Sequence, residues 1–145
     1  MLDTAKFLPD EFTGEANSMI YEYLCVAIAG RLEQNIKQVL VLHANNKSDA
    51  KMGAAVSRLC QQFQNPDKEK ILLLIELFDK DYSRRLRQDW SEEGSVGNTI
   101  SDLVGLRKAI AHQTTNSRNA TRTKVERFFQ AYRKFIGDFG AHFLG

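Results

Sequence analysis

The segment NSMIYEYLCVAIAGRLEQNIKQVLVLH, residues 17–43, decides the fold class of this chain. Its apolar side chains recur every four residues, at Ile20, Leu24, Ile28, Leu32, Ile36 and Leu40. Because an α-helix turns once in about 3.6 residues, this spacing gathers the apolar side chains into one stripe. We therefore predict a long amphipathic helix over these residues.

Four later segments show the same kind of spacing, and polar loops separate them. We predict helices over residues 49–63, 67–90, 98–112 and 121–143. The expected N-terminal caps are Ser48 or Asp49, then Asn65 with Pro66 at the first helical position, and finally Thr121 or Thr123. Apolar and aromatic side chains line the last helix and are expected in the core: Val125, Phe128, Phe129, Tyr132, Phe135, Ile136, Phe139 and Phe143. No linker or repeat divides the chain, so we predict one all-α domain over residues 1–145, a four- to five-helix up-and-down bundle.

Composition agrees with that fold class. The chain has 145 residues, of which 43% are hydrophobic and 26% charged, as in ordinary globular domains. No apolar run reaches the length of a membrane helix, and residues 1–6 lack the pattern of a signal peptide, so we expect a cytoplasmic protein without membrane contact. Cys25 and Cys60 both fall within helical apolar patterns and are expected as buried free thiols. The three histidines are scattered, and no metal site or cofactor is predicted.

Charge is unevenly distributed along the chain. The net charge is only +2, but residues 1–102 carry 12 basic and 16 acidic side chains, whereas residues 103–145 carry 8 basic and 2 acidic ones. An excess of this kind can mark a face for an anionic partner. Solvated lysines and arginines on helix surfaces explain it equally well.

Arg107 has an unusual place in its predicted helix. A projection at roughly 100° per residue puts it in the middle of an apolar arc formed by Ile100, Leu103, Val104, Ile110 and Ala111. A guanidinium in such an arc is costly unless something pairs with it. It is therefore either a functional group, or a structural one that reaches solvent or pairs with a core acid such as Glu33 or Asp102.

His112 follows Arg107 by five residues. A guanidinium binds phosphate and stabilises the charge that develops in phosphoryl transfer, and an imidazole transfers protons near neutral pH. Together they suit metal-free RNA cleavage, in which the 2′-hydroxyl attacks its own phosphodiester. Five residues place the two side chains about 140° apart on a straight helix. Either His112 turns inward at the helix end, or a second subunit completes the site around a two-fold axis along the Arg107 stripe.

The string LVGLRKAIAH, residues 103–112, resembles the HEPN superfamily (higher eukaryotes and prokaryotes nucleotide-binding), whose motif is Arg-x4-His near the end of a late helix. The long first helix with Glu33 and the aromatic last helix are similar to small stand-alone bacterial members of the RiboL-PSP-HEPN group. The resemblance implies a HEPN-type bundle and a homodimer with a composite cleft. It also implies a metal-independent endoribonuclease in which Arg107 contacts the scissile phosphate and His112 assists proton transfer. Many active members are toxins or phage-defence components with a partner, such as an antitoxin, encoded nearby.

One position departs from that pattern. Lys108 follows the arginine, where active members frequently carry Asn or another small polar residue. A lysine there either adds a phosphate contact or marks a lineage with altered or lost activity. Lys108, Thr114, Asn116 and Arg118 are candidates for RNA binding by proximity to the motif. Two alternatives stay open: a non-catalytic HEPN-like module that binds a nucleotide, RNA or a protein, and an unrelated helical bundle in which Arg107 is an ion-pair residue.

Overall fold

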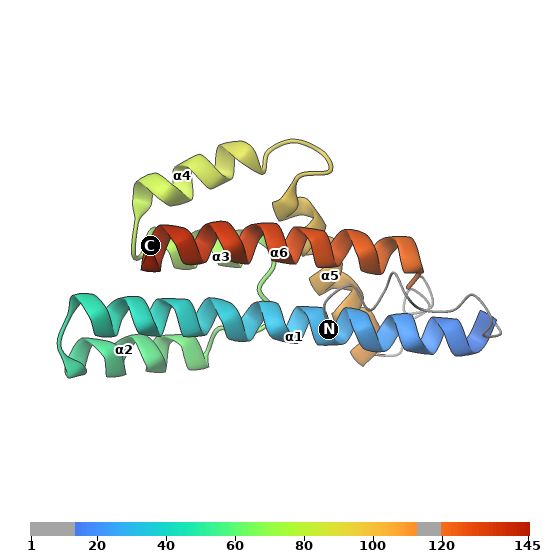
Figure 1. Ribbon diagram of the computed structural model, residues 1–145, viewed down its shortest axis with the longest axis horizontal. Helices are drawn as coiled ribbons and strands as arrows, with labels where there is room; N and C mark the ends of the chain where they lie inside the picture. The colour runs from blue at the N-terminus through green and yellow to red at the C-terminus, as the bar shows by residue number, and fades with distance from the viewer. Residues whose placement is uncertain (1–13, 113–119) are drawn as a thin grey trace.

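The structure is a computed structural model that describes residues 14–112 and 120–145. These residues form α-helices and no strand, which confirms the predicted all-α bundle (Figure 1). The described helices are α1 (Gly14–Lys47), α2 (Ala50–Gln61), α3 (Lys68–Glu76), α4 (Lys80–Asp89), α5 (Val96–Ala111) and α6 (Arg122–Leu144). Their number is one above the five predicted.

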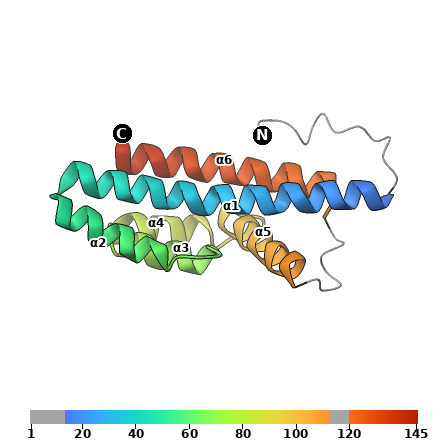
Figure 2. The ribbon, with the colours of Figure 1, turned by 90° about the horizontal axis from the view of Figure 1, so that it is seen from below.

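The two longest helices, α1 and α6, lie side by side and run in the same direction (Figures 1 and 2). α2 folds back along α1, whereas α5 crosses the pair obliquely. The apolar stripe of α1 is buried along its length and divides the core between two clusters. One joins Leu32–Ala44 of α1 to α2, α3, α4, the buried face of α5 at Ile100 and Val104, and the second half of α6. The other joins Tyr21–Ala29 to α5 and the first half of α6.

Helix α1 is longer than predicted at both ends. It begins at Gly14 and continues through residues 44–47, which were expected to form a loop. Ala44 explains the extension, because it is only 4% exposed and packs in the same cluster as Val56 of α2. Asp49 then caps α2 by accepting a hydrogen bond from the Met52 N–H at 3.0 Å, as predicted.

The single helix predicted over residues 67–90 is wrong, because the structure contains α3 and α4 there. The chain turns at Leu77 and Phe78, and Asp79 adopts an extended conformation and caps α4 through the Tyr82 N–H. The Ser83 hydroxyl then donates a 2.7 Å hydrogen bond to the Leu72 carbonyl and fixes α4 against α3. The predicted cap at Asn65 is also wrong, since Asp67 caps α3.

Asp79 holds two elements together, and its removal is expected to lower stability. Its Oδ2 lies 2.9 Å from Nε2 of His142 near the end of α6. The Tyr82 N–H, and after it the His142 side chain, hold the pKa of the Asp79 carboxyl below its ordinary value. We expect Asp79→Ala to lower the free energy of unfolding by about 1 kcal/mol through the lost cap, as measured by urea denaturation.

The charge of Asp79 adds a pH-dependent part to this effect. A depressed carboxyl pKa stabilises the folded state above the unfolded pKa, and that contribution disappears as pH falls through the folded pKa. Asp79→Asn keeps an amide oxygen as cap but has no charge. Its deficit relative to wild type is therefore expected at pH 6 and should be smaller at pH 3, below the unfolded pKa. A deficit that is equal at both pH values would contradict this assignment.

A close contact fixes the start of α5. Ser95 caps the helix, and the ring of Trp90 packs directly against Gly97. A Cβ at residue 97 would collide with the Trp90 ring, so only glycine fits there. Trp90 itself is 4% exposed and stacks edge-on against Phe135 of α6. This packing positions the helix that carries Arg107.

Candidate functional site

Arg107 and His112 lie near the C-terminal end of α5, where the helix leaves the core. Ile100, Leu103 and Val104 are almost completely buried, but Ile110 is only half-buried and Ala111 is exposed. The buried face therefore follows the predicted arc over the first three turns and opens in the last turn. Arg107 stands at this transition, with 26% of its side chain exposed.

The guanidinium of Arg107 faces α1. Its Nη1 lies 3.8 Å from Oε1 of Glu33, whose side chain is 11% exposed. That distance fits an ion pair but exceeds a hydrogen bond. Nη1 is buried and has no hydrogen-bond partner among the described residues. The structure thus selects Glu33 as the acid opposite Arg107, whereas Asp102, the other acid considered, lies 3.5 Å from Arg127 of α6.

Glu33 has further contacts that explain its burial. Its Oε1 accepts a 2.8 Å hydrogen bond from the N–H of Asn65, and its Oε2 lies 3.7 Å from Nζ of Lys37. Asn65 has a φ of 49°, a conformation that non-glycine residues rarely adopt. Glu33 therefore anchors the turn between α2 and α3 and faces two cations. Sequence reasoning missed this anchor, because nothing local connects residue 33 with residue 65.

His112 closes α5 and is exposed to solvent. Its backbone N–H donates to the Lys108 carbonyl at 3.0 Å, so the residue serves as the C-terminal cap. No described contact joins its imidazole to Arg107 or Glu33. In a regular helix the imidazole projects from the outward face, about 140° from the guanidinium. The structure therefore places the two residues at the same helix end without bringing their side chains together.

The outward face of α5 is bordered by basic residues. Gly105 and Lys108 are exposed on it. A cavity of about 340 Å³ on one side is lined by Ser101, Lys108 and Lys68 among others, and one of about 510 Å³ on the other side by Lys124 and Arg127. The ammonium group of Lys68 already has hydrogen-bond partners, because its Nζ donates to the Trp90 carbonyl at 2.7 Å and to Asn98 Oδ1 at 3.1 Å.

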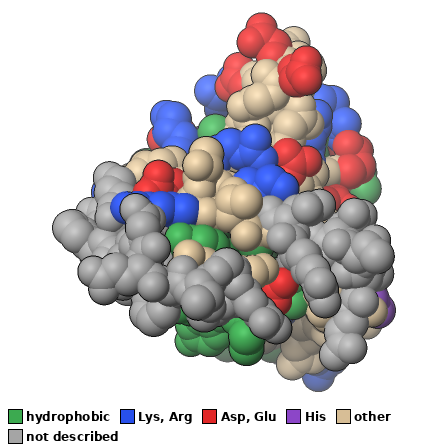
Figure 3. Space-filling model, turned by 90° about the vertical axis from the view of Figure 1, so that its right-hand side faces the viewer, with side chains coloured by type: hydrophobic (Ala, Val, Ile, Leu, Met, Phe, Trp, Pro, Cys, Tyr) green, Lys and Arg blue, Asp and Glu red, His purple; other side chains and the backbone are tan. Residues whose placement is uncertain are grey.

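Several of the basic side chains after residue 102 already have acidic partners. Arg122 lies 3.2 Å from Glu126, Arg127 lies 3.5 Å from Asp102, and Lys134 lies 2.9 Å from Asp138. The end of the molecule that shows the start of α1 and α6 accordingly displays Lys and Arg mixed with Asp and Glu (Figure 3). Lys108 and Lys124 remain beside α5 as basic residues for which the structure gives no ion pair. They are the best placed of the described cations to meet an anion on this face.

Three of the predicted RNA-binding residues, Thr114, Asn116 and Arg118, lie outside the described residues. Within residues 14–112 and 120–145, no group of three His, Cys, Asp or Glu side chains is arranged to hold a metal ion. Cys25 and Cys60 are buried free thiols, as predicted, and burial raises the pKa of the Cys25 thiol to about 12. None of the described helices has the length and apolarity needed to cross a membrane.

Comparisons of the chain with protein-family models, curated proteins and solved structures give no match. The resemblance to the HEPN superfamily therefore stays an expectation from the sequence, above all from residues 103–112.

Proposed function

We propose that this chain is a metal-independent endoribonuclease of HEPN type, which uses Arg107 and His112 at the end of α5. The observation that supports it best is the state of Arg107. Its guanidinium is held near Glu33 at 3.8 Å, has an unsatisfied Nη1, and leaves 26% of the side chain open to solvent. Because Nη1 is buried, a phosphate oxygen would accept from the other N–H groups of the guanidinium, on the exposed part of the side chain.

The reaction would proceed by transfer of the RNA phosphate to its own ribose. The imidazole of His112 takes the proton of the 2′-hydroxyl, the 2′-oxygen bonds to phosphorus, and the bond from phosphorus to the 5′-oxygen breaks. Arg107 stabilises the negative charge on the phosphoryl oxygens. The products are a 2′,3′-cyclic phosphate and a free 5′-hydroxyl.

We propose that a second copy completes the cleft. The two side chains diverge on α5, and the apolar arc beside Arg107 is covered within the chain by α1 and α6. A partner subunit therefore has to approach from the outward face or the end of α5, where Lys108 and His112 are exposed. A homodimer around that end would supply a second imidazole to protonate the leaving 5′-oxygen. A role as a toxin or in phage defence, with an antitoxin or similar partner, belongs to the same proposal.

The test is RNA cleavage by the purified protein in EDTA, with analysis of the product ends. We expect fragments that end in 2′,3′-cyclic phosphate, and a native mass measurement that gives twice the chain mass. Cleavage that requires Mg²⁺, or products that end in 3′-hydroxyl, would show that the mechanism is wrong.

The Glu33 contacts favour a second function, a non-catalytic module. If Glu33 neutralises Arg107 in the folded protein, the guanidinium has a structural task and the chain binds RNA, a nucleotide or a protein without turnover. Binding of labelled RNA without cleavage, with an affinity that decreases as salt increases, would identify this function.

A further inference from the structure

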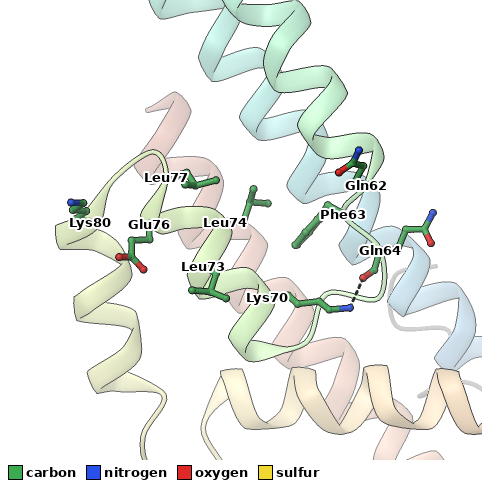
Figure 4. A pocket seen from close by; sticks show the side chains of 9 residues that line it. All are labelled: Gln62, Phe63, Gln64, Lys70, Leu73, Leu74, Glu76, Leu77 and Lys80. Carbon is green, nitrogen blue, oxygen red and sulfur yellow. Dashed lines mark hydrogen bonds between the residues drawn. The ribbon is translucent and has the colours of Figure 1, made fainter.

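An open apolar groove lies between the end of α2 and α3, away from Arg107. Figure 4 shows Phe63, Leu73, Leu74 and Leu77 around it, and the groove encloses about 720 Å³. Phe63 and Leu74 are buried and form its base. Leu73 and Leu77 are 53% and 68% exposed. Because they are four residues apart, the two leucines form one exposed ridge. Exposed apolar side chains that cluster in this way mark interaction sites.

No described helix covers this ridge. Helix α2 packs mainly on α1, and helix α3 packs mainly on α4 and α5. The space between α2 and α3 is therefore open to a further element. The apolar face of an amphipathic helix would cover Leu73 and Leu77, because such helices present side chains spaced by three and four residues.

The charges around the groove specify the chemistry of that element. Lys70 and Lys80 stand at its edges with Glu76 as the acid among its lining residues. The neighbouring acids have other partners, since Glu69 binds Arg87 at 2.9 Å and Asp81 binds Arg84 at 2.6 Å. The rim therefore has a positive excess, which complements an acidic partner.

We propose that this groove binds an acidic amphipathic helix of a partner protein. Its apolar residues would cover Leu73 and Leu77, and its carboxylates would face Lys70 and Lys80. A small amphiphile fits less well, because typical ligand pockets enclose most of their ligand, whereas the edges of this groove are exposed. The proposal does not depend on RNA cleavage, because none of its residues belongs to the end of α5.

The test uses a fluorescent synthetic helix of about 15 residues, with leucines spaced by three and four and glutamates on its other faces. A matched peptide carries lysines in place of the glutamates. By fluorescence anisotropy, we expect saturable binding of the acidic peptide and at least about tenfold weaker binding of the basic one.

Variants locate the binding site. Leu77→Glu and Lys80→Glu change exposed residues and are each expected to weaken binding by about tenfold or more. Met19→Glu is the matched control, because Met19 of α1 is similar in size to leucine and is 65% exposed. This variant should leave the affinity for the peptide unchanged. Circular dichroism of each variant verifies the fold.

Three results would overturn the proposal. The first is the absence of saturable binding of the acidic peptide, and the second is binding that Leu77→Glu leaves intact. The third is that the groove binds laurate, or that a second copy of this chain binds as judged by sedimentation, while the acidic peptide neither binds nor competes. In either case Leu77→Glu would have to abolish the binding.

Discussion

Cleavage of RNA in EDTA is expected to fall by about 100- to 10,000-fold when His112 is replaced by alanine, since general acid–base catalysis contributes a factor of this size. The imidazole is exposed, and the cap at this position is made by the backbone N–H, which alanine retains. Stability should therefore change by no more than about 0.5 kcal/mol. The measurement is the single-turnover rate of cleavage, with thermal unfolding of the same preparations.

His142→Ala is the matched control for this variant. His142 lies near the other end of α6 and contacts Asp79 at 2.9 Å, so the change affects a histidine outside the candidate site. It is expected to preserve cleavage while lowering stability slightly. If His112→Ala cleaves at the wild-type rate, His112 has no part in the chemistry and the nuclease mechanism is wrong.

Arg107 extends the same prediction. Arg107→Ala should abolish cleavage, and Arg107→Lys should recover little of it, because a lysine cannot offer two parallel donors to a phosphate. Arg84, an exposed arginine of α4, provides the control substitution Arg84→Ala. Recovery of full activity by Arg107→Lys would show that only a positive charge is needed at this position.

Long amphipathic patterns predicted the fold well. The stripes of α1 and α6 are buried as expected, and the caps at Asp49 and Thr121 are confirmed. The break between α3 and α4 escaped prediction, because Leu74, Phe78 and Tyr82 continue the four-residue spacing across it. Only the ability of Asp79 to cap a new helix distinguishes the break from a continuous helix, and an aspartate within a charged segment is a weak signal.

The candidate site shows a different limit. Periodicity predicted Arg107 in the middle of an apolar arc and suggested two acids as partners, whereas the structure places Arg107 where the buried face of the helix ends. The choice between Glu33 and Asp102 depends on how α5 crosses α1 and α6, and a single sequence does not specify that crossing. The hydrogen bond from the Asn65 N–H to Glu33 depends on the same arrangement, because it forms only after the turn before α3 has docked on α1.

Replacement of Glu33 by alanine is expected to lower the free energy of unfolding by about 3 kcal/mol, the largest stability effect that we predict. The change removes the acceptor of the Asn65 N–H and leaves Arg107 and Lys37 without their carboxylate. Glu33→Gln keeps an acceptor for the Asn65 N–H and should therefore cost only about 1 kcal/mol. Urea denaturation at neutral pH measures both values. Equal losses for the two variants would mean that the hydrogen bond from Asn65 contributes nothing and that the lost charge of Glu33 accounts for the whole effect.

The double variant Glu33→Gln/Arg107→Ala tests whether the 3.8 Å distance between Glu33 and Arg107 reflects a stabilising ion pair. If the two side chains form a working ion pair, the single effects are not additive, and the coupling energy should be about 0.5 kcal/mol or more. If the effects add within about 0.3 kcal/mol, Glu33 does not hold Arg107 energetically, and the guanidinium is available to an anion in the folded protein. Strong coupling together with wild-type RNA binding by Arg107→Ala would instead assign Arg107 to the core, because a residue that binds phosphate cannot be removed without loss of affinity.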